Sequence, residues 1–343
     1  MTDEKRASPL NETVGTGKKL LSWFTKGVRA LIAVFLILLA ISMCLTFISG
    51  IISSSQDESN NPLDFNHKGI TDERLAEMVA TGEIPSDVKN LWLNGNEISD
   101  LTPLESLTKL IHLNLGENNI SDLTPLQSLK KLRTLRLGFN EINDITPLLS
   151  MKNLRTLDLD ISEINDVTPI IHSLKNLTSL NLLSSNPQAI DDLTQLQSLT
   201  KLTNLGLSGY EISDLTPLQS MTKLIQLGLS DNEISDLTPL GSLKNLRVLF
   251  LGGNKISDLT PLETLTKLEF LDLSGNEISD LTPLQSLTKL QYMDLSGNNI
   301  SDLTPLQTLT NLRTLTLCDN EISDLDMTPL ESLPSLRSVF WDN

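Results

Sequence analysis

Residues 265–284 read LTKLEFLDLSGNEISDLTPL, and close variants of this phrase recur through most of the chain. The first leucine-type position of the phrase returns at a spacing that is usually 22 residues, at Val88, Leu110, Leu132, Leu154, Leu177, Leu202, Leu224, Leu246, Leu268, Leu290, Leu312 and Leu336. A unit this short cannot bury its own leucines and must stack on its neighbours. The period therefore predicts a solenoid of about twelve strands with one long open face.

Each repeat combines a strand pattern with a short return segment. Leu113 and Leu115 flank the polar Asn114, an alternation typical of a strand with one buried face. Thr102-Pro103 and its equivalents open the return segment, where we expect threonine to cap a helical turn and proline to take its first position. With so few residues per repeat, the sequence predicts an α/β solenoid. A parallel sheet lines its concave side, and 3-10 turns and extended segments form its convex side.

Asparagine occupies one fixed position in eight of the eleven completed repeats: Asn96, Asn118, Asn140, Asn232, Asn254, Asn276, Asn298 and Asn320. A buried asparagine must satisfy its donors and acceptor, so we expect these residues to bond loop backbone groups as a structural ladder. Ser162, Ser185 and Tyr210 replace asparagine in three consecutive repeats, and the spacing slips there. We expect an irregular middle in an otherwise uniform coil.

Residues 63–87 have the features of an amino-terminal cap, and residues 88–343 form the repeat domain. Thr71 before Asp72 and Glu73 is a helix-start signal, and Gly82 is a helix-stop signal. Leu75 and Met78 fall on one face of this helix. We expect the helix to cover the leucines of the first repeat, which would otherwise meet water.

Residues 30–52, ALIAVFLILLAISMCLTFISGII, contain no charged side chain. As a helix they would extend roughly 34 Å, enough to cross the hydrocarbon core of a bilayer. Basic residues precede the segment and acidic residues follow it, which favours a cytoplasmic location for residues 1–29 and an outer location for the repeats. A cleaved signal peptide is the alternative, although its apolar region is normally shorter. Residues 53–62, rich in serine and asparagine, are typical of a flexible linker.

The charge of the chain narrows the classes of partner. The net charge is −17, and the repeat side of the apolar segment carries 20 basic and 40 acidic residues. Because affinity for phosphate backbones comes from clustered lysine and arginine, nucleic acid is an unsuitable partner. Cys44 and Cys318 are the two cysteines, and they leave no pair for a disulfide within the repeats. If the domain is extracellular, a bacterial origin fits best.

The sequence contains no pattern that we interpret as catalytic or cofactor-binding. The three histidines, His67, His112 and His172, fall in different parts of a repeat and are not expected to share a metal. An aspartate recurs in every repeat, from Asp100 to Asp324, and this regularity favours a capping role in the turns. We therefore expect no metal site, no cofactor and no enzyme activity.

Partner selectivity is expected at concave positions that the repeat leaves free. Val248, Phe250, Phe270 and Tyr292 are predicted to form one exposed apolar patch on three adjacent strands, and such patches are typical binding anchors. Arg133, Arg136 and Arg155 form a basic cluster that suits a carboxylate or phosphate. Trp92 lies on the same face. Tolerated surface variation is the alternative interpretation for both groups.

The stretch from about Ile70 to Asn343 resembles the 22-residue leucine-rich repeats of the internalin and SDS22-like class. The phrase at residues 265–284 carries this resemblance, which covers about four-fifths of the chain. The resemblance implies a leucine-rich repeat horseshoe whose concave face binds a ligand. Internalins usually add an immunoglobulin-like module and a wall anchor after the repeats, and neither pattern is visible here, so host-cell invasion is not inferred.

These observations lead to one main hypothesis and two alternatives. The main hypothesis is a single-pass bacterial membrane protein whose repeats bind a protein or a glycan outside the cytoplasmic membrane, in the periplasm or extracellularly. The first alternative is a structural, self-associating envelope protein. The second, from the resemblance to SDS22, is a regulatory subunit facing the cytoplasm.

Overall fold

The computed structural model describes residues 62–343, except residues 165, 187–189, 191–192, 321–326 and 342–343. The chain divides into two units, Met1–Asn60 and Asn61–Asn343, and the second contains the repeats. The predicted cytoplasmic segment 1–29, membrane segment 30–52 and almost all of the linker 53–62 lie outside the described residues. Within the described ranges, no helix has the length and apolar character needed to cross a membrane.

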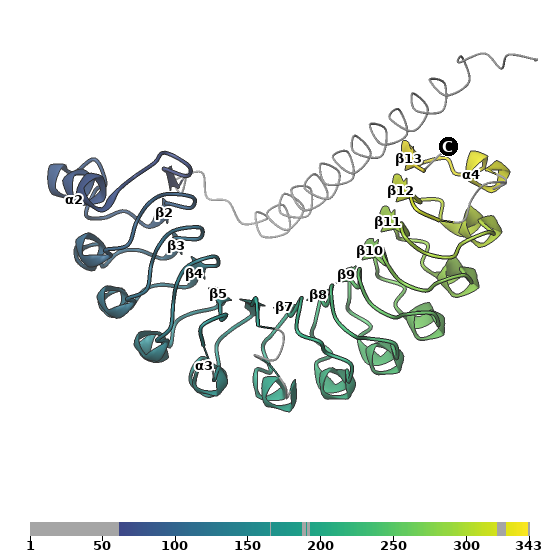
Figure 1. Cartoon of the computed structure of the whole chain (residues 1–343), viewed down its shortest axis with the longest axis horizontal. Helices are drawn as coiled ribbons and strands as arrows, with labels where there is room; N and C mark the ends of the chain where they lie inside the picture. The colour runs from purple at the N-terminus through teal and green to yellow at the C-terminus, as the bar shows by residue number, and fades with distance from the viewer. Residues whose placement is uncertain (1–61, 165, 187–189, 191–192, 321–326, 342–343) are drawn as a thin grey trace, which may run out of the picture. The chain divides into compact units, whose positions relative to one another are not determined.

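The repeats form one parallel sheet whose strand order follows the chain. Its thirteen strands are β1 (Leu63–Asp64), β2 (Asn90–Trp92), β3 (His112–Asn114), β4 (Thr134–Leu137), β5 (Thr156–Asp160), β6 (Ser179–Leu183), β7 (Asn204–Gly206), β8 (Gln226–Gly228), β9 (Val248–Phe250), β10 (Phe270–Asp272), β11 (Tyr292–Asp294), β12 (Thr314–Thr316) and β13 (Ser338–Phe340). Within the repeat unit, the strands line the concave side of an arc and the helical turns its convex side (Figure 1). Twelve strands match the repeat count, and β1 is an addition from the cap.

The convex side consists mainly of 3-10 turns, as the short return segments predict. These are η2 (Thr102–Ser106), η3 (Thr124–Ser128), η4 (Thr146–Ser150), η5 (Leu193–Ser198), η6 (Thr216–Ser220), η7 (Thr238–Ser242), η8 (Thr260–Thr264), η9 (Thr282–Ser286) and η10 (Thr304–Thr308). Short α-helices replace them at α3 (Thr168–Ser173) and α4 (Thr328–Glu331).

In the 3-10 turns that begin with threonine, the predicted threonine cap is wrong and the predicted capping aspartate is confirmed. The threonine side chain does not cap the turn; threonine is instead the first residue of the turn, as at Thr102 in η2. The aspartate two residues earlier takes the capping role, because Oδ1 of Asp100 accepts a hydrogen bond of 2.8 Å from the backbone N–H of Thr102. The same bond recurs from Thr124 to Asp122 and from Thr282 to Asp280. The hydroxyl and backbone N–H of Thr124 together hold the pKa of Asp122 below its ordinary value.

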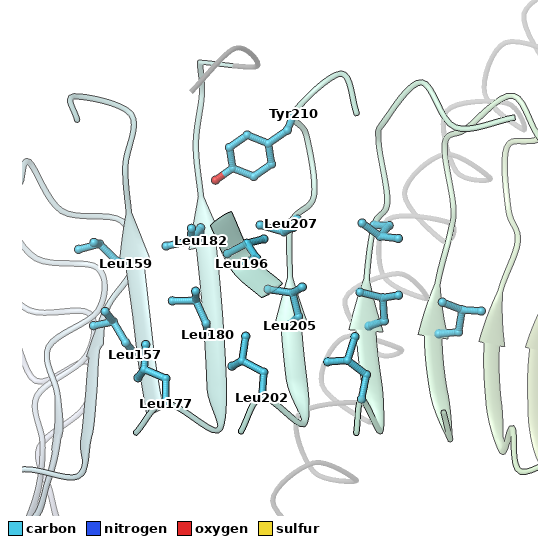
Figure 2. Close-up of a cluster of buried hydrophobic side chains, with 14 of the residues drawn as sticks. Leu157, Leu159, Leu177, Leu180, Leu182, Leu196, Leu202, Leu205, Leu207 and Tyr210 are labelled. Carbon is cyan, nitrogen blue, oxygen red and sulfur yellow. The ribbon is translucent and has the colours of Figure 1, made fainter. Parts of the chain in front are cut away.

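The leucines of successive repeats form the core. Leu268, Leu271 and Leu273 of one repeat are completely buried, and their equivalents in neighbouring repeats are buried as well. In Figure 2, leucines from successive strands, such as Leu157, Leu180 and Leu205, lie in rows across the sheet. Each repeat therefore contributes one layer to a shared core, as the 22-residue period predicts.

The asparagine column forms hydrogen bonds that link adjacent repeats. Oδ1 of Asn254 accepts from the N–H of Ile234 in the preceding repeat at 3.0 Å. Its Nδ2 donates to the carbonyls of Leu229 and Leu251 at 3.0 and 2.9 Å. The Leu229 carbonyl also accepts from Asn232, so one carbonyl joins two consecutive asparagines. This shared pattern runs from Asn96 to Asn140 and again from Asn232 to Asn320.

The irregular middle replaces this ladder with strand and side-chain bonds. Strands β5 and β6 each extend to five residues, so that Asp160 pairs with Leu183. The Ser162 hydroxyl donates to Asp160 Oδ1 at 2.6 Å and accepts from the N–H of Ser185 at 2.8 Å. Serine is too short to reach the carbonyls that asparagine joins. The longer strand pair therefore supplies hydrogen bonds that the ladder lacks here.

Tyr210 fills the asparagine position of the next repeat. Its side chain is buried, and its ring lies beside Leu182, Leu196 and Leu207 in Figure 2. Among the described residues its hydroxyl has no hydrogen-bond partner. Burial, and then the charge of Asp160, raises the pKa of this phenol. The ring thus fills the space of the ladder without reproducing its hydrogen bonds.

Replacing Tyr210 by phenylalanine is expected to raise the free energy of unfolding by about 1 kcal/mol, because the substitution removes a buried hydroxyl without a partner and keeps the ring. Urea denaturation of the full chain measures the change. Tyr292→Phe, at the second of the chain's two tyrosines, is the control and should change stability by less than about 0.5 kcal/mol, because Tyr292 is partly exposed. A destabilised Tyr210→Phe variant would show that the hydroxyl has a partner.

The amino-terminal cap contains helix α2 (Asp72–Thr81), with Thr71 at its N-cap and Gly82 at its C-cap in the left-handed conformation. Leu75 and Met78 are buried, as predicted. Asp72 joins the cap to the first repeat, because its carboxylate accepts hydrogen bonds from the N–H groups of Ser99 and Asp100 at 2.7 and 2.9 Å. The cap is therefore bonded to the first repeat as well as covering it.

Candidate binding face

Two columns of side chains cover the concave sheet, one on each side of the central buried residue, which is leucine in most strands and Met293 in β11. The first column includes His112, and the second includes Asn114. Parallel register places equivalent residues of consecutive repeats side by side, so Phe270 lies beside Val248 and Tyr292. Because the leucines and the ladder fix the rest of each repeat, these columns carry most of the variation on this face.

Three aromatic rings, which we call the aromatic row, lie on strands β9 to β11. The ring centroids of Phe250 and Phe270 are 4.8 Å apart with planes inclined by 46°. Those of Phe270 and Tyr292 are 4.2 Å apart with nearly parallel planes. The structure thus brings together the three aromatic residues that the sequence placed on adjacent strands.

The prediction that this whole group is exposed is wrong for two of its members. Phe270 is 7% exposed and Val248 is 1% exposed. Phe250 and Tyr292 pack against opposite sides of the Phe270 ring, and Val248 lies next to Phe270 in the same column. Phe250 and Tyr292 stay partly exposed. Val248 and Phe270 therefore support the two rings that a partner can reach, and a direct role for any of the four in binding stays a prediction.

Two carboxylates, Asp272 and Asp294, border the aromatic row. They follow Phe250 in the second column and lie side by side on β10 and β11. Burial raises the pKa of both groups, and the nearby charges of Asp294 and Asp231 raise that of Asp272 further. Ser274 and Ser296 each donate a backbone N–H bond of 3.0 Å to the neighbouring aspartate. Among the described residues, no ion pair includes either carboxylate.

The raised pKa values have a consequence for stability. A carboxyl group whose pKa is higher in the folded state stabilises the fold at low pH, and this contribution is lost as the pH rises through the folded pKa. At neutral pH the charges of Asp272 and Asp294 therefore weaken the fold. Carboxyl groups with shifted pKa values, whose charge lowers the stability of the fold, occur often at functional sites.

The basic cluster lies nearer the amino-terminal end of the sheet. Arg136 is on β4, and Arg133 and Arg155 immediately precede β4 and β5. Arg133 and Arg155 are exposed neighbours, since the N–H of Arg155 donates to the carbonyl of Arg133 at 2.8 Å. Nε of Arg136 is 3.3 Å from Oδ2 of Asp158 but makes no hydrogen bond there, so the contact is an ion pair alone. Asp158 thus offsets part of the positive charge, although burial still raises its pKa. The structure brings the three arginines together, while Trp92, 39% exposed, lies two strands away on β2.

Sequence reasoning missed one exposed aromatic side chain. Phe139, in the loop after β4, is 63% exposed and has a φ of 57°, in the left-handed region. Side chains with a Cβ rarely adopt this conformation, and Gly95, Gly253, Gly275 and Gly297 occupy the equivalent position in other repeats. Glu117, Asp231 and Asp319 also occupy this position with a positive φ, so a large apolar side chain where other repeats place glycine or an acidic residue was the signal available in the sequence.

Histidine, cysteine, aspartate and glutamate carry the side chains that commonly bind metal ions or transfer protons. Within the described ranges, no group of three histidine, cysteine, aspartate or glutamate side chains is positioned to hold a metal ion. His112 is an exposed residue of β3 beside β4, and its Nδ1 lies 2.9 Å from the hydroxyl of Thr134. Burial lowers the pKa of His112, and the charges of Arg133 and Arg136 lower it further.

Comparison with known proteins places the fold in one family. The family model of leucine-rich repeats in two copies matches residues 87–128, 130–172, 222–264 and 266–308. The internal stretch that it leaves unmatched, 173–221, includes Ser185 and Tyr210 of the irregular middle. No curated protein matches the chain.

Two solved internalins from Listeria monocytogenes resemble the chain in sequence and structure. Internalin inlF is 36% identical, with a TM-score of 0.62, and the match covers 75% of this chain and 82% of that one. The functional domain of InlJ is 28% identical, with a TM-score of 0.55, and the match covers 77% of this chain and 55% of that one. InlJ contains a cysteine ladder. This chain has two cysteines and a column of asparagines.

A more distant neighbour shows the fold alone. The ectodomain of the Arabidopsis thaliana receptor kinase GASSHO1/SCHENGEN3, solved in complex with CASPARIAN STRIP INTEGRITY FACTOR 2, is 20% identical with a TM-score of 0.51. The match covers 79% of this chain and 39% of that one. The 36% identity to inlF and the matches to the repeat family model are more specific evidence of family than this shared fold. The chain therefore belongs to the internalin-like leucine-rich repeat proteins of bacteria.

Proposed function

We propose that this protein is a membrane-anchored binding module whose concave face engages a protein partner outside the cytoplasmic membrane. The observation that carries this proposal is a pair of partly exposed rings, Phe250 and Tyr292, on the concave sheet. The buried Phe270 packs against both rings, and the neighbouring Asp272 and Asp294 are in no ion pair among the described residues. Exposed aromatic side chains on a rigid support are typical anchors of protein interfaces. No catalytic role is proposed.

Family membership supports a protein ligand in general. Internalin-like repeats are binding modules, and the receptor kinase ectodomain, which shares the fold, was solved with a bound protein factor. A glycan ligand is the alternative outcome.

The location rests on the sequence. Residues 30–52 have the length and apolar character of a membrane helix, and the basic residues before them favour a cytoplasmic amino end. The proposed order is a cytoplasmic segment 1–29, a membrane helix 30–52, a linker 53–62, the cap 63–87 and the repeats 88–343.

A membrane-impermeant, amine-reactive cross-linker added to intact spheroplasts tests location and binding together. We expect the full chain to form an adduct with a protein, and Trp92→Ala combined with Phe250→Ala to remove it, because both changes truncate concave aromatic side chains. Gln127→Ala combined with Gln285→Ala, on the convex turns η3 and η9, is the control and should leave the adduct unchanged.

Three results would contradict the proposal. An adduct that appears only after permeabilisation would indicate a cytoplasmic regulatory subunit. A dimer of this chain as the sole adduct would indicate a self-associating envelope protein. An adduct that both variants retain would exclude the concave face as the binding surface.

A further inference from the structure

The carboxylate pair Asp272 and Asp294 is bordered by aromatic rings on two sides. Phe250 precedes Asp272 in the second column, and the paired Phe270 and Tyr292 occupy the first column of the same two strands. The hydroxyl of Tyr292 makes only a long contact of 3.5 Å to Oδ2 of Asp294, while Oδ1 accepts the N–H bond of Ser296. The arrangement combines two negative charges with exposed apolar ring surface.

The described surroundings do not balance these two charges. Neither carboxylate is in an ion pair among the described residues. Arg247, which precedes β9, is bonded to Glu269 at 2.8 Å instead. Asp272 accepts hydrogen bonds from the N–H and the hydroxyl of Ser274, and Asp294 accepts one from the N–H of Ser296; these donors are uncharged. The charge of Asp231 adds to the negative field at Asp272. A cation from outside would therefore relieve a repulsion that the fold leaves in place.

We propose that this part of the concave face binds a basic segment of the partner protein, with a lysine or arginine cation at Asp272 and Asp294 and its aliphatic stem along the rings of Phe250 and Tyr292. The proposal rests on the proposed function and names the chemistry of its ligand. Aromatic faces attract cations, and long basic side chains bury their apolar stems against such rings.

The observations favour a basic peptide over two other ligands. An acidic ligand suits Arg133 and Arg155, which lie several strands away, and it would be repelled here. A neutral glycan would stack on Tyr292, but it would not offset the charges of two adjacent carboxylates. Burial raises the pKa of both aspartates, which agrees with a site whose charges are compensated only when a cation arrives.

Fluorescence anisotropy with a labelled decapeptide of alternating lysine and serine tests the proposal on the full chain in detergent micelles. A second peptide, with every lysine acetylated, has the same length and lacks the charges. We expect the wild-type chain to bind the lysine peptide and not the acetylated one. The double variant Asp272→Asn and Asp294→Asn should weaken binding more than about 30-fold, because each charge–charge contact is lost.

The aspartates of the turns provide a matched control. Asp280→Asn combined with Asp302→Asn removes the same two charges from the same two repeats, on the opposite side of the coil. This variant should bind the peptide as the wild type does. Equal losses in the two double variants would show that the peptide responds only to net charge, and would overturn the proposal.

Thermal denaturation of the same variants separates a binding role from a structural one. Asparagine keeps an oxygen that can accept the N–H bonds of Ser274 and Ser296, and it removes the buried charges. The Asp272→Asn and Asp294→Asn variant should therefore have a higher melting temperature at neutral pH while it loses peptide binding. A lower melting temperature together with lost binding would indicate a structural role and overturn the proposal.

The outcomes also distinguish this inference from the proposed function. If the wild-type chain does not bind the lysine peptide but cross-links to an outer protein through its concave face, the inference fails and the proposed function stands. Repeats facing the cytoplasm would contradict the proposed function and leave the peptide result unchanged. Binding of both peptides with equal affinity would show that the charge is irrelevant and would overturn the inference.

Discussion

Replacing Asn254 by alanine is expected to lower the free energy of unfolding by about 3 kcal/mol. The side chain is buried, and its amide makes hydrogen bonds to the N–H of Ile234 and to the carbonyls of Leu229, Leu251 and Gly252. Alanine leaves several of these backbone groups without a partner, and each buried unsatisfied group costs about 1–3 kcal/mol. Urea denaturation of the full chain, followed by circular dichroism, measures the loss.

Asn245→Ala is the matched control for this experiment. Asn245 is exposed; its side-chain amide donates a hydrogen bond of 2.9 Å to the carbonyl of Thr222 and accepts one of 2.7 Å from the exposed Lys267. Because water can replace the amide in both bonds, we expect a loss below about 1 kcal/mol. If both variants lose the same amount of stability, the buried ladder has no special contribution and our account of the asparagine column is wrong.

Replacing Leu249 by alanine should lower the free energy of unfolding by about 2–5 kcal/mol, the range for a leucine that leaves a cavity in a packed core. Leu249 is the central residue of β9 and is completely buried beneath the aromatic row. Its equivalents Leu227 and Leu271 on the neighbouring strands are also completely buried, so the layers on either side cannot collapse freely into the space. Urea denaturation measures this change too.

Leu149→Ala provides the comparison for the core substitution. Leu149 lies in the convex turn η4 and is only partly buried, so the same change of side chain removes fewer contacts. We expect a loss below about 1.5 kcal/mol. A loss at Leu149 as large as that at Leu249 would contradict the placement of the main core behind the sheet.

Much of the fold follows from the sequence because the repeat applies the same constraint many times. The 22-residue period predicts parallel strands that share one core, and Leu268 and Leu271 show this burial. The spacing slip and the missing asparagines predict the irregular middle around Ser162 and Ser185. The internal gap in the family matches falls on the later part of this stretch, around Ser185.

Other features depend on contacts that the linear pattern does not contain. Strand β1 has two residues, Leu63 and Asp64, and forms only because the edge of β2 offers it backbone partners. The recurring aspartate caps the turns as predicted, but the pattern does not show that Thr102, predicted as a cap as well, is the first residue of its turn and donates the capping bond. The burial of Phe270 results from rings on two other strands, and the sequence alone does not give the angle at which those rings meet.

The break in the asparagine ladder divides the coil mechanically. Between Asn140 and Asn232, the described residues contain no asparagine amide that joins the carbonyls of two consecutive repeats. Each half has its own continuous series of such crosslinks, whereas at the join the five-residue pairing of β5 with β6 and the bond between Ser162 and Ser185 take their place. A pulling force along the coil would therefore load backbone hydrogen bonds at this join, and both backbone and side-chain amide hydrogen bonds in the two halves.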